Sequence, residues 1–362
     1  MRITAVEVQV VEPGMHTVVA ERLILNLSNV VVRIRTDEGV EGVAGATTYL
    51  GAHAAASAVA ELRPLLVGED PLYRERLWQR LFEVSTIVLP PHALAVIDCA
   101  LWDLAGKLSG LPVCKLLGAQ RELVRAYAST LTYEDIPSFE REVAAALERG
   151  FKAIKLHVWG DPDRDIELVG RIRRLTGPDV ALMIDAVGSY DVPSALRVGR
   201  RLEELGYEWF EMPIRDQFIQ GYELLAAALD IPVTSGEVNT YTFHEAGNYI
   251  ARKAWDIVRV DAGISGGITG TRKTAVLAEG FGMRCEIHSF GYALAQAANL
   301  QVMGAVKNCR YFEYPMPLNG YDQGMLDRIE VDDDGNVPVP QKPGIGLEVD
   351  WERMDAMTTA RY

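Results

Sequence analysis

The chain has 362 residues, of which 49% are hydrophobic and 24% charged, a composition typical of a folded globular protein with a sizeable core. Its net charge of −14 and the lack of a basic cluster argue against nucleic-acid binding. No apolar run approaches the roughly 20 residues of a membrane span, and the sequence after Met1 shows no signal peptide. The four cysteines form no Cys-x-x-Cys pair, which indicates buried thiols in a reducing compartment, so we expect a cytoplasmic protein.

Strands followed by helices occupy the first part of the chain. Val6, Val8 and Val10 alternate with polar residues, which predicts a strand with one buried face. Further strands lead to about residue 50, and helical patterns fill residues 51–110, so we predict an α+β domain over residues 1–122. Asp98 and Asp103 lie inside a nearly apolar helix, and we interpret them as paired or capping groups rather than catalytic ones.

From residue 123 to residue 317 short apolar runs alternate with helical patterns. Reactive residues recur every 24 to 30 positions, each at or just past the carboxyl end of such a run: Lys155 with His157, Asp185, Glu211, Glu237, Asp261, His288 and Glu313. This spacing fits one buried strand plus one crossover helix. Eight such strands predict a closed parallel barrel whose carboxyl-end face carries the site. We expect the turn-rich segment 318–362 to pack back on the first domain.

Three of these residues are carboxylates on successive strands, namely Asp185, Glu211 and Glu237. Singly, such an acid is more often a helix cap or a surface ion pair. Three acids in register would repel one another without a cation, and an all-oxygen ligand set suits Mg²⁺ or Mn²⁺ better than zinc. We therefore predict a divalent metal site.

The remaining strand-end residues supply acid–base groups around that metal. Asp261 can orient the imidazole of His288 and leave its second nitrogen as a base, although a lone histidine of this kind is often only a satisfied core residue.

Across the barrel, Lys155 and His157 both point inward because they alternate on one strand. Lys155 can neutralise a substrate carboxylate, and His157 can act on the opposite face of the substrate. Glu313 can donate to a forming oxyanion if it is protonated, the alternative being a structural ion pair. A metal and a lysine together make abstraction of a proton α to a carboxylate feasible, because they stabilise the resulting enediolate.

At these residues the chain resembles the enolase superfamily, mandelate racemase subgroup. The resemblance rests on Ile184-Asp185-Ala186, Trp209-Phe210-Glu211-Met212-Pro213, Ser235-Gly236-Glu237, Asp261 with Gly266-Gly267-Ile268-Thr269, and His288. It covers essentially the whole chain and implies a modified TIM barrel, (β/α)₇β, with an α+β capping domain. It also implies a homo-oligomer, often an octamer in that family, and capping-domain loops that select the substrate. In those loops His16, Tyr49 and His53 are candidates for substrate contact, and so are Trp159 and Tyr190 at strand ends.

One departure concerns the reaction. Many members of the subgroup have Lys-x-Lys where this chain has Lys155-Leu156-His157, which argues against lysine-mediated racemisation. Because many members dehydrate sugar acids, the resemblance implies a Mg²⁺-dependent dehydratase of an aldonate or aldarate, with Glu313 bonding the substrate carboxylate. A racemase, epimerase or cycloisomerase that uses the same enediolate remains the alternative. A non-catalytic carboxylate-binding protein is the remote one.

Overall fold

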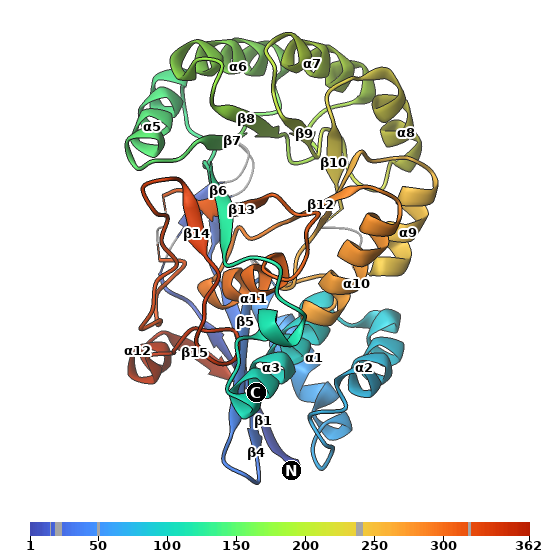
Figure 1. The fold of residues 1–362 in the computed structure, drawn as a ribbon, viewed down its shortest axis with the longest axis vertical. Coiled ribbons are helices and arrows are strands. Elements are labelled where there is room, and N and C mark those ends of the chain that lie inside the picture. The colour runs from blue at the N-terminus through green and yellow to red at the C-terminus, as the bar shows by residue number, and fades with distance from the viewer. Residues whose placement is uncertain (15, 19–23, 49–50, 237–241, 318–319) are drawn as a thin grey trace.

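The computed structural model describes residues 1–14, 16–18, 24–48, 51–236, 242–317 and 320–362, without the side chains of residues 16–18, 24–26 and 86–88. The chain forms an antiparallel sheet with covering helices and, above it in Figure 1, a parallel barrel ringed by helices. The predicted fold class, a modified (β/α)₇β TIM barrel with an α+β capping domain, is confirmed. No helix in the described part of the chain has the length and apolarity that a bilayer crossing requires.

The capping domain is a four-stranded antiparallel sheet covered by helices. The strand order is β15 (Thr358–Arg361), β1 (Ile3–Val11), β4 (Asn29–Thr36) and β5 (Glu41–Thr47). The other elements of this region are a hairpin of β2 (His16–Val18) and β3 (Ile24–Asn26), and helices α1 (Ala52–Leu62), η1 (Arg63–Leu65), α2 (Arg74–Val88), α3 (Pro91–Ser109) and α4 (Val113–Leu116). Strand β5 approaches α3 so closely that a Cβ on Gly42 would lie 2.0 Å from the carbonyl oxygen of Ala100. A glycine is therefore required at that crossing.

In the described part of the chain eight strands form the barrel, and the pairs along their ladder are parallel. They are β6 (Leu123–Ser129), β7 (Ala153–His157), β8 (Ala181–Asp185), β9 (Trp209–Glu211), β10 (Val233–Ser235), β11 (Ile257–Val260), β12 (Arg284–Ile287) and β13 (Tyr311–Pro315). The ladder runs from β12 back to β6 and on to β13. Between β12 and β13 the hydroxyl of Ser289 donates to the carbonyl of Glu313 and accepts from its N–H, so a side chain helps to close the barrel.

Seven helices follow the first seven strands and shield the barrel from water (Figure 1): α5 (Ile136–Glu148), α6 (Pro162–Thr176), α7 (Val192–Glu204), α8 (Ile219–Ala228), α9 (Phe243–Ala251), α10 (Gly267–Gly280) and α11 (Ala293–Met303). Asp135, Asp161 and Asp191 cap α5, α6 and α7, accepting hydrogen bonds from N–H groups in the first turns. Each cap is followed by a proline in the first turn, so the sequence itself starts these helices close to the strand ends.

The segment after the barrel joins both parts of the molecule. Strand β14 (Asn336–Pro338) pairs with β6, and β15 pairs with β1 after the short helix α12 (Trp351–Ala356). The buried carboxylate of Asp103 accepts from the backbone N–H groups of Val43 and Ile345 and pairs with Lys107. Asp103 is therefore a paired core residue, as predicted.

Asp98 joins the capping domain to the barrel. Its carboxylate accepts from both the N–H and the hydroxyl of Thr269 at the start of α10, which confirms its predicted role as a capping group. Burial raises the pKa of Asp98 to about 7, although Thr269 and Arg74 oppose that shift.

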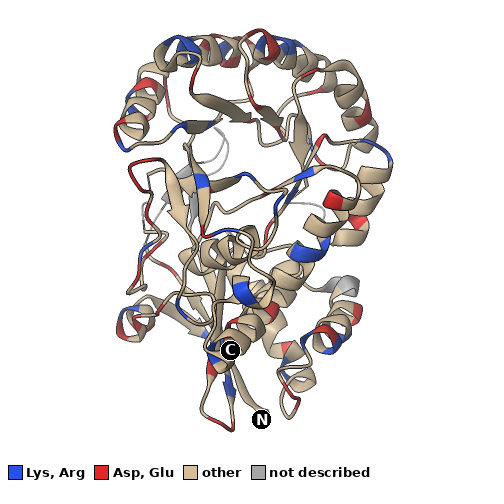
Figure 2. Cartoon of the chain, viewed as in Figure 1, with Lys and Arg blue, Asp and Glu red and all other residues tan. Residues whose placement is uncertain are grey.

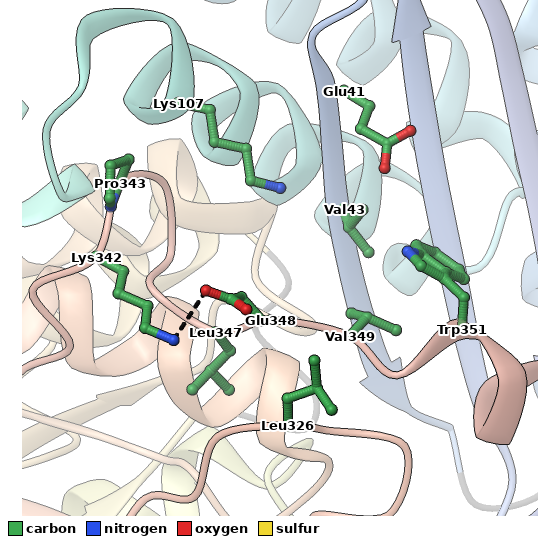
Figure 3. A pocket seen from close by; sticks show the side chains of 10 residues that line it. All are labelled: Glu41, Val43, Lys107, Leu326, Lys342, Pro343, Leu347, Glu348, Val349 and Trp351. Carbon is green, nitrogen blue, oxygen red and sulfur yellow. Dashed lines mark hydrogen bonds and ion pairs between the residues drawn. The ribbon is translucent and has the colours of Figure 1, made fainter.

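A cavity of about 510 Å³ lies between β5 and the segment 326–351 (Figure 3). Its lysines are already paired, Lys107 with Asp103 and Lys342 with Asp327 and Glu348. None of the predicted site residues lines this cavity. Figure 2 shows acidic and basic residues interspersed over the barrel helices.

Candidate active site

The inward-facing residues of the barrel form layers, because side chains alternate along each strand. The lowest layer is apolar, and the rings of Tyr127, Trp209 and Tyr311 meet edge to face there, with centroids 5.6 to 6.1 Å apart. On five strands the next inward residue is charged, and these residues are Lys155, Asp185, Glu211, Arg259 and Glu313. Along these strands the inward-facing side chains therefore change from apolar to charged within two residues.

Two cations and two carboxylates form a closed ring in the charged layer. Lys155 Nζ lies 2.8 Å from Glu211 Oε1 and 2.7 Å from Glu313 Oε1. Arg259 Nη2 lies 3.0 Å from Glu211 Oε1 and 2.9 Å from Glu313 Oε2. All four side chains are fully buried. Burial acts to lower the pKa of Lys155, but Glu211 and Glu313 outweigh it and raise that pKa well above its ordinary value.

Two of the three predicted metal ligands lie side by side. Asp185 and Glu211 are register partners on β8 and β9, and both carboxylates reach Lys155, Asp185 Oδ2 at 3.5 Å. The oxygens of these two carboxylates thus already bind the ammonium group of Lys155. A set of carboxylate oxygens of this kind fits a hard divalent cation. The third predicted ligand, Glu237, lies outside the described residues. Among the described residues no group of three histidine, cysteine or acidic side chains is disposed to hold a metal ion.

The pKa of Asp185 reflects the same surroundings. Burial acts to raise this pKa, but Lys155 and His157 outweigh it and hold the pKa well below its ordinary value. Asp185 also accepts from the N–H of Val187 at 2.8 Å. The carboxylate is therefore ionised and fixed in place at the strand end.

Asp261 and His288 form the expected pair. Asp261 Oδ2 lies 2.7 Å from His288 Nδ1, while its Oδ1 accepts from the N–H of Gly263 and from the side-chain amide of Asn299. Burial acts to raise the pKa of Asp261, but the hydrogen bond from His288 outweighs it, and the net shift is downward. The carboxylate thus holds the proton on Nδ1 and turns Nε2 of His288 toward the site, 3.8 Å from Glu313 Oε2.

His157 is held in the same way from the opposite strand. Its Nδ1 lies 2.5 Å from the carbonyl oxygen of Thr130, which can only accept, so this nitrogen carries a hydrogen. Its Nε2 then faces the site and lies 3.3 Å from Asp185 Oδ2. The ring of Phe290 packs against the imidazole edge to face. His157 and His288 therefore both direct their Nε2 atoms toward the site.

The structure brings Glu313 into the site but argues against the predicted donor role. Its Oε1 accepts from Lys155 and Ser129, and its Oε2 from Arg259. Burial acts to raise the pKa of Glu313, but Lys155, His288 and Arg259 outweigh it and hold the pKa well below its ordinary value. The two cations that approach Glu313 thus favour its ionised form, which accepts hydrogen bonds, over the predicted donor.

The other predicted contact residues are mostly structural or undescribed. Tyr49 and the side chain of His16 lie outside the described residues. His53 Nδ1 is 2.8 Å from the hydroxyl of Tyr362 on the exposed side of α1. Trp159 donates its indole N–H to the carbonyl of Tyr133, and Tyr190 donates to Asp165, so both hold loops together.

Sequence reasoning missed three positioning residues, Arg259, Thr130 and Asn299. Arg259 gave a signal, since it interrupts the apolar run of residues 257–260 at the same inward register as Asp261. Thr130 acts through its backbone, and Asn299 acts from α11, so neither position can be recognised from spacing along the strands.

The barrel, its cap and the strand-end acids and bases define a barrel enzyme of the enolase class. Residues 138–353 match the family described as enolase C-terminal domain-like. Residues 4–118 match the N-terminal domain of the mandelate racemase / muconate lactonizing enzyme family. The chain belongs to this family, as the sequence motifs predicted.

Relatives of known name extend over most of the chain. An arabinonate dehydratase from Saccharolobus solfataricus is 32% identical over 88% of this chain and 88% of its own. A D-galactarolactone cycloisomerase from Agrobacterium fabrum is 31% identical over 100% of this chain and 99% of its own. The crystal structure of a D-glucarate dehydratase from Agrobacterium tumefaciens, complexed with magnesium, superposes with a TM-score of 0.88 at 34% identity, covering 99% of this chain and 100% of that one.

Proposed function

We propose that this chain is a Mg²⁺-dependent dehydratase that converts an aldonate or aldarate to a 2-keto-3-deoxy acid. The proposal is carried by the two imidazoles on opposite strands, His157 and His288, which are both anchored through Nδ1 and present Nε2. Dehydration needs one group that removes the C2 proton and one that protonates the departing 3-hydroxyl. Relatives named as dehydratases of arabinonate and glucarate support this reaction class.

The chain's own residues divide the work as follows. His288 takes the C2 proton, because Asp261 stabilises the imidazolium that forms. The C–H electron pair moves into the carboxylate to give an enediolate, whose charge Lys155 stabilises. His157 gives a proton to the 3-hydroxyl, the C3–O bond breaks, and water leaves. The resulting enol then tautomerises to the 2-ketone.

Asp185, Glu211 and Glu237 are the residues that would hold the magnesium ion. When bound, it supplies Lewis-acid stabilisation of negative charge on the substrate carboxylate. The magnesium in the related glucarate dehydratase supports this cofactor. The charged layer below the mouth supports it too, since Lys155 shows that these carboxylates accept a cation.

The second candidate is a cycloisomerase acting through the same enediolate. It is favoured by the A. fabrum D-galactarolactone cycloisomerase, which matches this chain over its whole length. In that reaction the enediolate forms without net loss of water. The same His288 would remove the proton, and only the fate of the leaving oxygen would differ.

Proton NMR in D₂O with Mg²⁺, against a library of mono- and diacid sugars, separates these reactions. Loss of the C2 signal with appearance of a 2-keto-3-deoxy product is the expected result and identifies the substrate. Exchange or isomerisation without loss of water would establish an isomerase instead. The His288→Asn variant should lose turnover by about 10³-fold or more while Mg²⁺ binding, measured by calorimetry, stays unchanged. Retained turnover would overturn the assignment of His288.

A further inference from the structure

Arg259 is an unusual residue for the interior of a barrel strand. Its side chain is fully buried on β11, between the apolar floor and the site. Its guanidinium reaches three other strands, to Glu211 on β9, to Glu313 on β13, and at 3.3 Å to the hydroxyl of Tyr127 on β6. A buried arginine is costly unless carboxylates compensate it, so these contacts fix its place.

The arrangement of the ring shows what Arg259 does for Lys155. Both carboxylates of the ring bind both cations, and Glu313 Oε2 is bound by Arg259 while its Oε1 is bound by Lys155. With Arg259 present, two positive charges face Glu211 and Glu313, and the carboxylate of Asp185 lies beside them, 3.5 Å from Lys155. Without it, the ammonium of Lys155 would be shared between two carboxylates, and an incoming anion would meet a net negative charge.

We propose that Arg259 is a positioning residue that balances Glu211 and Glu313 and so leaves Lys155 able to attract the substrate carboxylate. This inference rests on the proposed function, because it assigns the anion site to Lys155. Arg259 is fully buried on β11, so its position does not place it against the substrate. Its influence on the anion passes through Lys155 and the two carboxylates.

Loss of the Arg259 charge should therefore weaken anion binding but not Mg²⁺ binding. In Arg259→Gln, a positive charge close to Glu211 is lost, which removes repulsion toward Mg²⁺, so Mg²⁺ affinity should stay the same or increase. Affinity for oxalate, a planar dianion that resembles an enediolate, should fall by at least about 10-fold, because the loss of one buried positive charge near the site weakens the attraction of a dianion even at an effective dielectric constant near 40. Arg259→Lys keeps the charge and should recover most of the oxalate affinity.

Arg284 provides a matched control at the other end of the barrel. Its side chain on β12 is 20% exposed, and it bridges two carboxylates as Arg259 does, Glu208 at 3.0 Å and Glu286 at 2.7 Å. Arg284→Gln should lower thermal stability, yet Mg²⁺ and oxalate should bind with unchanged affinity. A purely structural role of Arg259 would make the two variants behave alike.

The experiment is calorimetric titration of the full-length wild type and the three variants with Mg²⁺, and then with oxalate in saturating Mg²⁺. The expected result is weaker oxalate binding with unweakened Mg²⁺ binding in Arg259→Gln, and recovery in Arg259→Lys. Equal oxalate affinity in Arg259→Gln and wild type overturns the inference, as does a parallel loss of both ligands. If Arg259→Gln does not fold, an Arg259→Lys protein with fully lost oxalate binding overturns it. A wild type that binds neither ligand refutes the proposed function instead.

Discussion

Glu313 offers a direct test of whether the charged layer is ionised. In Glu313→Gln the shape is kept, but one negative charge leaves a fully buried ring that holds Lys155 at 2.7 Å and Arg259 at 2.9 Å. The new amide NH₂ must face one of these two donors, so a hydrogen bond becomes a donor–donor contact. Removing one partner of a buried charge pair costs roughly 3–5 kcal/mol of unfolding free energy, because the remaining charge stays buried.

The assay is urea unfolding of the metal-free protein at pH 7, followed by tryptophan fluorescence. Glu348→Gln is the control, since Glu348 pairs with Lys342 at 2.9 Å but is 60% exposed. That variant should lose less than about 1 kcal/mol. If Glu313→Gln lost no more than this control, the carboxyl group would be neutral in the folded protein. That result would refute the inference that Glu313 is ionised, and it would favour Glu313 as the donor to a forming oxyanion.

Two further predictions concern stability. Because the pKa of Asp98 is about 7 in the folded protein against a usual 3.8, the stability it contributes is fully present below about pH 4 and is lost as the pH rises to 7. The unfolding free energy of Asp98→Asn should not fall in this pH range, whereas that of the wild type should fall by a few kcal/mol. The same dependence on pH for both proteins in urea unfolding would contradict this prediction. Gly42→Ala should destabilise by at least about 2 kcal/mol, because its Cβ would lie 2.0 Å from the Ala100 carbonyl oxygen. Gly280→Ala, at the open end of α10, should be neutral or stabilising by about 0.5 kcal/mol, and thermal unfolding that ranks the two variants in the opposite order would contradict this packing.

Spacing along the chain was enough to predict the barrel and the facing of its strand-end residues. The regular return of Asp185, Glu211, Asp261 and His288 reflects a physical repeat, since each strand and helix together need about the same length. Inward alternation likewise placed Lys155 beside these residues. Such inferences succeed because strand register is local and periodic.

The protonation and pairing of Glu313 could not be predicted in the same way. They depend on Arg259, which lies 54 residues away in the sequence, on β11, two strands along the barrel from β13. The orientation of His157 depends on a backbone carbonyl at Thr130, and that of Asp261 depends on Asn299 from a helix. These contacts join residues that come together only when the barrel closes, so the residue pattern along one strand cannot predict them.

The pairing of β15 with β1 bears on how the molecule is made. Residues 358–361 supply an outer strand of a sheet whose other strands lie within the first 47 residues. A ribosome releases the whole barrel before it releases that strand, so the sheet is completed only after the barrel sequence has emerged. Until then β1 exposes a row of unpaired backbone groups, a template for pairing with other nascent chains. The topology thus leaves β1 as an open sheet edge until β15 has emerged.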